Sequence, residues 1–305
     1  MKIRFYNHWH SGDVFHAKGY IQDMQAQCGD QVQITYAHVN HPKLMADISP
    51  HEEVPVTCQD REKASMETDV VNVNTWIGAY GWEVMPRGED HANWPSIHRM
   101  FGLIYSQLRS MGLPLSFNFD RPELYIPTTD FSCYEIARGN DFLDRTMDRK
   151  RALFCNGRVR SQQSKLELQE ETIEALAREF EDWAFIATAR FPTDLPNIYF
   201  TDDIFDIDND INEIAYLSTH SNIIVGKNSG PFMYTHIQDN FWSPETTFLS
   251  LSHRPSDCYP YHMAWSTEAC RYLHHCGDSN SRITEILREV IKNPGQSRGS
   301  VEVID

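Results

Sequence analysis

Apolar and polar positions follow two patterns in the first half of the chain, one typical of buried strands and one typical of helices. Short apolar runs predict strands, at residues 2–7, 31–39 and 69–76. A helix is expected to open at Ser11 or Gly12 and to end at Gly29. Another is expected over residues 95–112, because apolar side chains recur there at helical spacing: Ile97, Phe101, Ile104, Leu108 and Met111.

The same alternation restarts after a charged segment, residues 140–151. Apolar runs predict further strands, at residues 151–157, 183–189, 197–205, 222–227 and 246–253. Helices are expected over residues 209–221 and 229–239. Another helix is expected where Leu166, Ile173, Leu176, Ala177 and Phe180 form one apolar face. A last helix is expected from the apolar face that runs from Ile283 to Ile291. The tail, residues 293–305, is expected to be loosely held.

Strands that alternate with helices predict an α/β protein whose parallel sheets are covered on both faces. The restart of the pattern predicts two Rossmann-like domains, residues 1–148 and residues 149–305, that face a cleft. We expect ligands beyond the carboxyl ends of the strands.

Composition and charge argue against several classes of function. The 305 residues carry a formal charge of −16, which argues against a stable complex with nucleic acid. No apolar run is long enough to cross a bilayer, and no apolar signal segment follows Met1. The seven cysteines include no Cys-x-x-Cys pair. We therefore expect a cytoplasmic protein without a transmembrane segment.

The loop after the first predicted strand is rich in histidine, with His8, His10 and His16 close to Asp13. Gly12 removes a side chain where a ligand could approach the backbone. Asp13 falls in the first turn of the next helix, where the helix dipole favours an ionised carboxylate. Such a carboxylate suits a general base. Alternatively, Asp13 only caps its own helix.

A second loop follows the strand at residues 151–157 and concentrates cations and hydroxyls: Arg158, Arg160, Ser161, Ser164 and Lys165. Arginine binds a pyrophosphate through paired hydrogen bonds, and hydroxyls add neutral donors. We expect this cluster to bind a diphosphate. A solvated basic turn is the alternative.

A third loop follows the strand at residues 222–227. Gly226 ends that strand beside Lys227, and Ser229, Gly230 and Pro231 are suited to open a helix. These residues predict a second anion-binding helix start. The same residues are also good helix-start chemistry without any ligand.

Two of these stretches resemble a known family. "SGDVFHAKGYIQDM" and "LSTHSNIIVGKNSGPFMYTHI" resemble the first helix start and the donor-binding segment of the ADP-heptose:lipopolysaccharide heptosyltransferases, which are GT-B glycosyltransferases. The resemblance implies that Asp13 is the catalytic base and that Ser229 and Gly230 contact the donor phosphates. Asn228 stands where the family commonly has an acidic residue, and Met233 where it commonly has histidine. His236, one turn beyond Met233, is a candidate substitute.

The resemblance implies an inverting displacement that needs neither a cofactor nor a metal. A nucleoside-diphosphate sugar is the donor, and the acceptor is a hydroxyl of a glycan, a protein or a small molecule. His8 or His10 would orient the acceptor or the transferred sugar.

Two other functions remain open. His8, His10 and Asp13 could bind a metal in a hydrolase. The chain could also be a catalytically silent GT-B relative that binds a nucleotide or sugar. Trp9 and the aromatic residues of the segment 74–82 could stack on sugar rings, although core packing is the favoured interpretation for each of them.

Overall fold

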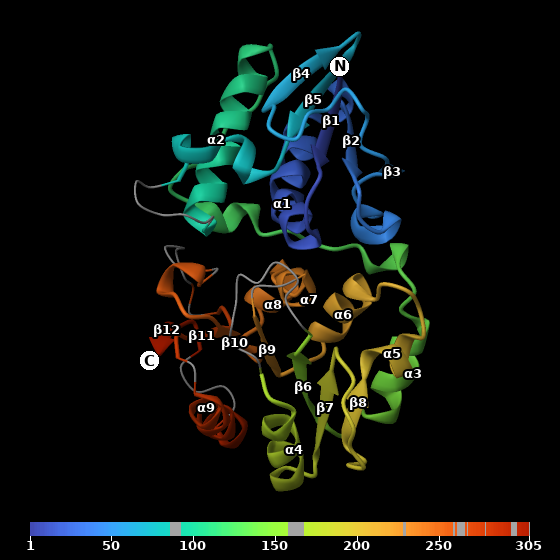
Figure 1. Cartoon of the computed structure of the whole chain (residues 1–305), viewed down its shortest axis with the longest axis vertical. Helices are drawn as coiled ribbons and strands as arrows, with labels where there is room; N and C mark the ends of the chain where they lie inside the picture. Colours follow the sequence, from blue (N-terminus) through green and yellow to red (C-terminus); the bar gives the residue numbers. More distant parts are fainter. Residues whose placement is uncertain are drawn as a thin grey trace. The chain divides into compact units, whose positions relative to one another are not determined.

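The computed structural model describes residues 1–85, 93–157, 168–227, 230–258, 260, 266, 268–277, 279–293 and 298–304. The chain divides after Cys133 into two compact units, here called unit 1 and unit 2 (Figure 1). The sequence placed the division after residue 148, at the start of the next strand. Helix α3 (Ala137–Arg145) precedes that strand and packs against α5 (Thr201–Phe205) and α6 (Ile211–Ser218) of unit 2, and so the division falls earlier.

Unit 1 is built on a five-stranded sheet in the order β3-β2-β1-β5-β4. Its elements are β1 (Lys2–Asn7), α1 (Ser11–Cys28), β2 (Gln33–His38), β3 (His51–Glu52), β4 (Ala64–Glu67), β5 (Val70–Asn74) and α2 (Trp94–Ser110). The predictions of β1, α1, β2, β5 and α2 are confirmed. Strand β4 pairs antiparallel with β5, whereas β1, β2, β3 and β5 are parallel, so the expected parallel arrangement breaks at this edge.

Helix α1 lies close to the segment that follows α2. A Cβ atom at Gly19 would stand 1.8 Å from the backbone oxygen of Tyr125, so only glycine allows this approach. The ring of Tyr20, one residue further along α1, stacks on Phe101 with a centroid distance of 3.9 Å. These contacts fix the position of α1 in unit 1.

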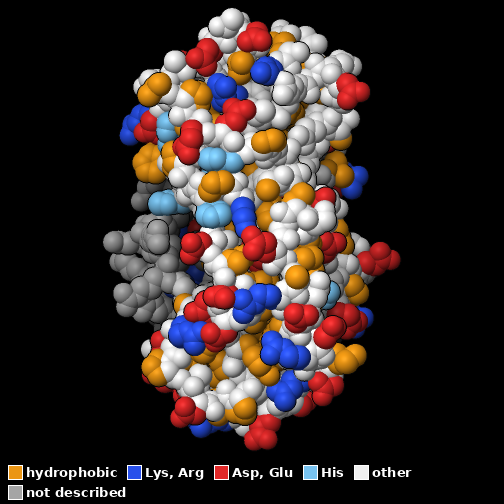
Figure 2. Space-filling view, turned by 90° about the vertical axis from the view of Figure 1, so that its right-hand side faces the viewer, with side chains coloured by type: hydrophobic (Ala, Val, Ile, Leu, Met, Phe, Trp, Pro, Cys, Tyr) orange, Lys and Arg blue, Asp and Glu red, His pale blue; other side chains and the backbone are white. Residues whose placement is uncertain are grey.

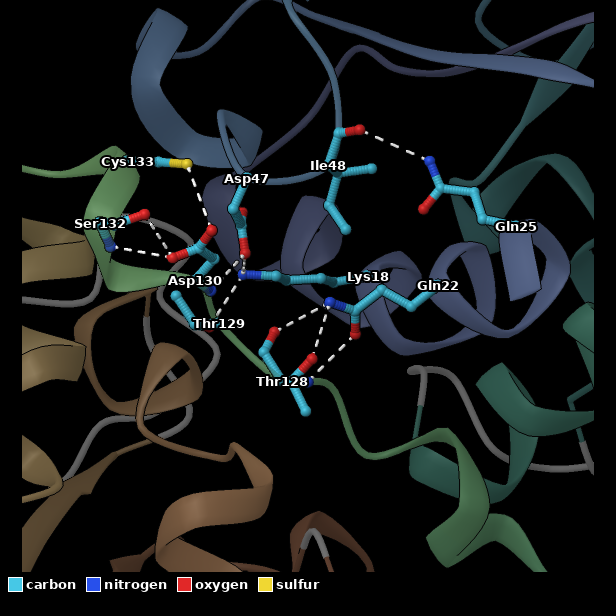
Figure 3. Close-up of polar contacts among 10 residues, drawn as sticks. All are labelled: Lys18, Gln22, Gln25, Asp47, Ile48, Thr128, Thr129, Asp130, Ser132 and Cys133. Atoms are coloured by element: carbon cyan, nitrogen blue, oxygen red, sulfur yellow. Dashed lines mark hydrogen bonds and ion pairs between the residues drawn. The ribbon is translucent and has the colours of Figure 1, made fainter. Parts of the chain in front are cut away.

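A buried ion pair ties α1 to two further segments of unit 1 (Figure 3). Lys18 Nζ lies 2.7 Å from an oxygen of Asp47, and both side chains are almost fully buried. Lys18 also donates to the hydroxyl of Thr129 at 2.8 Å, and the Asp130 N–H donates to Asp47 at 3.2 Å. Burial lowers the pKa of Lys18, and the charge of Asp47 opposes that change. The pair therefore joins α1, the loop after β2 and the segment that leads to unit 2.

Unit 2 is built on a seven-stranded parallel sheet in the order β12-β11-β10-β9-β6-β7-β8. Its strands are β6 (Lys150–Cys155), β7 (Trp183–Ala187), β8 (Ile198–Phe200), β9 (Ile223–Lys227), β10 (Thr247–Leu251), β11 (Arg271–His275) and β12 (Val301–Ile304). After α3, its helices are α4 (Glu170–Glu179), α5 (Thr201–Phe205), α6 (Ile211–Ser218), α7 (Gly230–Tyr234), α8 (Gln238–Phe241) and α9 (Asn280–Lys292). Helices α4 and α9 cover one face of the sheet, and α6, α7 and α8 cover the other (Figure 1).

Three predictions about unit 2 are wrong in detail. The run 197–205 forms only the short strand β8 and then turns into α5, because the polar residues Thr201 to Asp203 open a helix. The helix expected over residues 229–239 is divided into α7 and α8. The tail is not loose at its end, since β12 pairs with β11 and extends the sheet. Among the described residues, no helix is long and apolar enough to cross a membrane.

We predict that Lys18→Met destabilises the protein by about 3–5 kcal/mol, because it leaves the buried Asp47 carboxylate without its cation. The double variant Lys18→Met/Asp47→Leu should recover most of that loss. Urea unfolding of the full chain measures both. Arg282→Ala is the control, since its ion pair with Glu285 is exposed and should be worth under about 0.5 kcal/mol. A Lys18→Met variant as stable as the wild type would contradict the prediction.

Candidate functional site

The sheet of unit 2 has one topological switch point, between β6 and β9. From β6 the chain proceeds outward to β7 and β8, and from β9 it proceeds the other way to β12. Ligands of open parallel sheets bind beyond the carboxyl ends of the strands at such a point. The two loops that the sequence singled out follow these two neighbouring strands. The side chains predicted there to bind the donor lie largely outside the described residues: Arg158, Arg160, Ser161, Ser164, Asn228 and Ser229.

The described residues of the loop after β9 are largely engaged in packing. Lys227 is the last residue of β9 and is 2% exposed. A Cβ atom at Gly226 would stand 2.6 Å from the ring of Phe232, so glycine is needed there for packing against α7. Gly230 opens α7, which has only five residues and therefore a small dipole. Anion binding at this loop stays a prediction.

His236 belongs to the core of unit 2. Its Nδ1 lies 2.8 Å from the carbonyl oxygen of Phe232, and its Nε2 lies 2.9 Å from the hydroxyl of Tyr272. The ring is completely buried among aromatic side chains. The suggestion that His236 replaces a ligand-binding histidine at Met233 is therefore wrong.

Unit 1 has its own switch point, between β1 and β5. Strands β2 and β3 lie on one side of β1, and β5 lies on the other. The loop after β1 carries His8, Trp9 and His10, and His10 is the N-cap residue of α1. Asp13 stands in the first turn of α1, directly at this point of the sheet.

The environment of Asp13 differs from the predicted one. We expected the helix dipole to keep the carboxylate ionised, but burial has the larger effect and raises the pKa of Asp13 to about 6. The charge of His10 and a hydrogen bond from the His10 backbone oppose this rise. Asp13 accepts this hydrogen bond at the start of α1, whose N-cap residue is His10, and its role as a cap or as a base stays a prediction. Its pKa also lies close to neutral pH, where a general base works best.

A polar network lies at the ends of the neighbouring strands. The hydroxyl groups of Tyr36 and Thr75 are 2.6 Å apart, and Asn7 Nδ2 donates to Thr75 Oγ1 at 3.4 Å. Burial raises the pKa of Tyr36, and the nearby charge of Asp13 adds to the rise, so the phenol stays protonated. His38 ends β2 and is completely buried. Burial lowers the pKa of His38 to about 4, and His51 adds to that effect, so His38 is neutral at pH 7.

The histidines of the first loop have separate environments. His8 Nε2 lies 3.2 Å from the carbonyl oxygen of Cys58, and the ring packs edge-on against Tyr6. His10 is exposed. Burial lowers the pKa of His16 to about 4, and its ring packs beside Trp94. Figure 2 shows histidine side chains gathered on the surface of unit 1.

The structure gives no support to a metal site on His8, His10 and Asp13. Within the described ranges, no group of three or more histidine, cysteine or acidic side chains is arranged to hold a metal ion.

The prediction of core packing is wrong for two tryptophans. Trp9 is 37% exposed and Trp82 is 85% exposed. The indole of Trp9 stacks on that of Trp76 with a centroid distance of 4.6 Å. Sequence reasoning missed this pair, although a repeated signal marks it. An Asn-x-Trp triplet follows the end of both β1 and β5, as Asn7-His8-Trp9 and Asn74-Thr75-Trp76.

Comparison with known proteins supports the fold that this topology suggests. No family model matches the chain, and no curated protein matches its sequence. Solved structures do match. The E. coli ADP-heptose lps heptosyltransferase II is 12% identical, with a TM-score of 0.57, and the match covers 96% of this chain and 99% of that one. The fold is heptosyltransferase-like GT-B.

Two further solved structures share this fold. The glycosyl transferase family 9 protein of Veillonella parvula is 13% identical, with a TM-score of 0.54, and the match covers 98% of this chain and 92% of that one. The UDP-GlcNAc 2-epimerase of Neisseria meningitidis, solved with UDP-GlcNAc bound, is 11% identical, with a TM-score of 0.53. That match covers 99% of this chain and 95% of the epimerase chain. At these identities the likeness establishes the GT-B-like fold, which glycosyltransferases and epimerases share.

We predict that Asp13→Asn stabilises the protein above pH 6. The pKa of Asp13 is higher in the folded than in the unfolded chain, so the protonated carboxyl contributes stability below about pH 4 that is lost as the pH rises through 6. Asparagine does not titrate and keeps this contribution. The difference in unfolding free energy should grow from near zero at pH 4 to about 2 kcal/mol at pH 8, allowing for partial solvation.

Urea unfolding at several pH values measures this difference. The control is Asp30→Asn, which removes an exposed carboxyl of the same unit. A difference that does not grow with pH for Asp13→Asn, or that grows as much for Asp30→Asn, would refute the assignment.

Proposed function

We propose that the protein is an inverting, metal-independent glycosyltransferase that moves a sugar from a nucleoside-diphosphate sugar to an acceptor hydroxyl. The observation that carries the proposal is the position of the polar loops. The cationic loop after β6 and the loop after β9 leave the two strands that flank the switch point of unit 2. Asp13 stands at the corresponding point of unit 1.

The reaction that we propose is a single displacement. The Asp13 carboxylate takes the proton of the acceptor hydroxyl, and that oxygen attacks the anomeric carbon of the donor. The bond from the anomeric carbon to the phosphate oxygen breaks, and the nucleoside diphosphate leaves with the electron pair. Attack opposite to the leaving group inverts the configuration at carbon.

Charge on the departing diphosphate is the largest electrostatic demand of this reaction. Arg158 and Arg160 are the cations that we propose to meet it, together with the hydroxyl groups of Ser161 and Ser164. Paired hydrogen bonds from arginine to phosphate supply both charge and orientation. In a chain of net charge −16, two arginines in one loop at a strand end are a specific feature.

A nucleotide sugar is the donor class that the structural neighbours favour. One neighbour is named for ADP-heptose and another was solved with UDP-GlcNAc. Met233 is 3% exposed, so the position that is commonly histidine in heptosyltransferases contributes to the core of unit 2 here. We therefore propose the reaction type and leave the nucleotide to a direct test.

A thermal-shift panel of ADP, GDP, UDP, CMP and their sugar conjugates, run with and without EDTA, tests donor binding. A nucleotide present at 100 times its Kd should add about 2.7 kcal/mol of stability. We predict that one nucleoside diphosphate stabilises the protein and that EDTA does not change this. No response to any nucleotide, together with a melting temperature that falls in EDTA, would instead favour a metal-dependent hydrolase.

Release of the nucleoside diphosphate from the donor so identified tests catalysis. We predict that Asp13→Asn lowers kcat by about 10²- to 10⁴-fold, because the acceptor loses its base. Donor binding should stay within about twofold of the wild type. For the wild type, kcat/KM should rise with pH through about 6, as the Asp13 carboxyl ionises, and then level off.

Two results would contradict these assignments. Full activity of Asp13→Asn would remove Asp13 as the base. Donor binding without turnover by the wild type, across all acceptors supplied, would favour a silent binding protein. Arg160→Ala should weaken donor binding, with Arg138→Ala, an exposed arginine paired with Asp206, as the control.

A further inference from the structure

The stacked pair Trp9–Trp76 stands at the switch point of unit 1. Strands β1 and β5 are neighbours in the sheet, and each leads into one of the two tryptophans. Their ring planes are inclined by 28°, in a stacked arrangement. The pair therefore occupies the place where an open parallel sheet presents its ligand-binding loops.

The same turn holds both tryptophans at their backbone. The Asn7 side-chain oxygen accepts from the Trp9 N–H at 2.8 Å, and the Asn74 side-chain oxygen accepts from the Trp76 N–H at 2.9 Å. A Cβ atom at Gly78 would stand 2.2 Å from the indole of Trp76, so glycine is what allows this ring to fold over the backbone. The geometry of the pair is thus built into the strand ends.

Polar contacts fix Trp9 further while its ring remains accessible. Its indole N–H donates to Asp60 at 3.0 Å, and its carbonyl accepts from Asn40 Nδ2 at 2.5 Å. Even so, 37% of Trp9 is exposed. Trp9 is thus held by four contacts: three hydrogen bonds and the stacking on Trp76. They keep a large apolar side chain partly exposed to water, although burying it would be more favourable.

Rigid aromatic surfaces flanked by a few polar groups are typical of small-ligand sites. The exposed His10 ring stands edge-on to Trp9 at 6.4 Å, and Asp13 follows in the first turn of α1. A pyranose ring has an apolar C–H face that packs on an indole and a rim of hydroxyls that bind imidazole, carboxylate and amide groups. The Trp9–Trp76 pair supplies such an apolar surface, and His10 supplies an imidazole next to it.

The charged groups in the loops around the tryptophan pair indicate whether a neutral or an anionic sugar fits there. The four loops that leave the parallel strands at this edge, residues 8–13, 39–47, 53–63 and 75–85, contain six carboxyl groups against three cations, Lys43, Arg61 and Lys63. Two of the six, Asp47 and Glu83, are paired with Lys18 and Lys63. Asp60 lies directly beside Trp9, whose indole N–H donates to it. A phosphorylated or carboxylated glycan would meet repulsion here, whereas a neutral one would not.

We propose that Trp9 and Trp76 form a stacking platform for a neutral pyranose ring of the acceptor glycan. The role of this glycan as the acceptor rests on the proposed glycosyl transfer. Binding of the glycan itself needs no donor and can be measured separately.

Titration of the full chain with neutral hexasaccharides tests the platform, by saturation-transfer NMR and by tryptophan fluorescence. The probes are malto-, cello-, manno- and chito-hexaose, with a hyaluronan hexasaccharide as the anionic probe. We expect at least one neutral probe to bind and Trp9→Ala to weaken its binding about tenfold or more, the effect of losing about 1.4 kcal/mol. Trp9→Phe should restore part of the affinity.

The control is Trp82→Ala, which removes a more exposed indole of the same unit that is outside the stacked pair. It should leave binding within about twofold of the wild type. Three outcomes overturn the proposal: no neutral probe binds, Trp82→Ala weakens binding as much as Trp9→Ala, or the anionic probe binds more tightly than every neutral one.

Donor turnover on the same preparation separates this inference from the proposed function. Nucleoside diphosphate release without binding of any neutral glycan defeats the platform and leaves the transferase. Glycan binding that depends on Trp9, without any response to nucleotides, keeps the platform and defeats the transferase.

Discussion

The ion pair of Lys18 and Asp47 is the constraint on which the arrangement of unit 1 depends. An unpaired charge at such depth would cost several kcal/mol, so each partner requires the other to stay in place. Lys18 lies on α1, Asp47 lies after β2, and Thr129 and Asp130 lie on the segment that ends the unit. One interaction thereby fixes three segments that are distant in sequence. A buried pair of apolar residues could give similar stability, but its contacts would be less directional.

This constraint bears on the chemistry because α1 carries Asp13 at its first turn. The helix cannot slide or rotate without breaking the pair or moving Gly19 away from Tyr125. The partial burial of the Asp13 carboxyl, which sets its pKa near 6, is therefore a consequence of how α1 is held. In the proposed mechanism, stability and reactivity are opposed at Asp13, since the ionised carboxylate that the proposed base presents is the less stable form in the fold.

Local patterns predicted the elements whose determinants are close together in sequence. Strand β1 and helix α1 follow from one apolar run and one helix start, and both were found at the expected residues. Strand β12 was missed, because four residues of alternating polarity form a strand only when β11 offers an edge. Helix α3 was missed for a similar reason. Its charged sequence has few apolar positions, and Phe142 becomes buried through packing within unit 2.

The candidate site was predictable to the extent that it consists of loops after strands. The sequence identified Asp13 and the two loops of unit 2, since polar residues after an apolar run are visible without a structure. It did not identify the buried polar groups beside Asp13, those of Tyr36, Thr75 and His38, which come together only when the sheet brings the strand ends side by side. Their positions follow from the register of β1 against β2 and β5.

The tryptophan pair shows most clearly what a topology adds to a sequence. Trp9 and Trp76 are far apart along the chain, and each alone is most economically interpreted as a core residue. The strand order makes them neighbours, and the shared Asn-x-Trp triplet then has a physical meaning, because the same turn at two adjacent strand ends aims two indoles at one another. A core pair would have been buried by the next segment of chain. Here one indole remains exposed while Asp60 and Asn40 hold it, and a stacked but accessible ring that polar groups fix in place is better explained by a ligand than by packing.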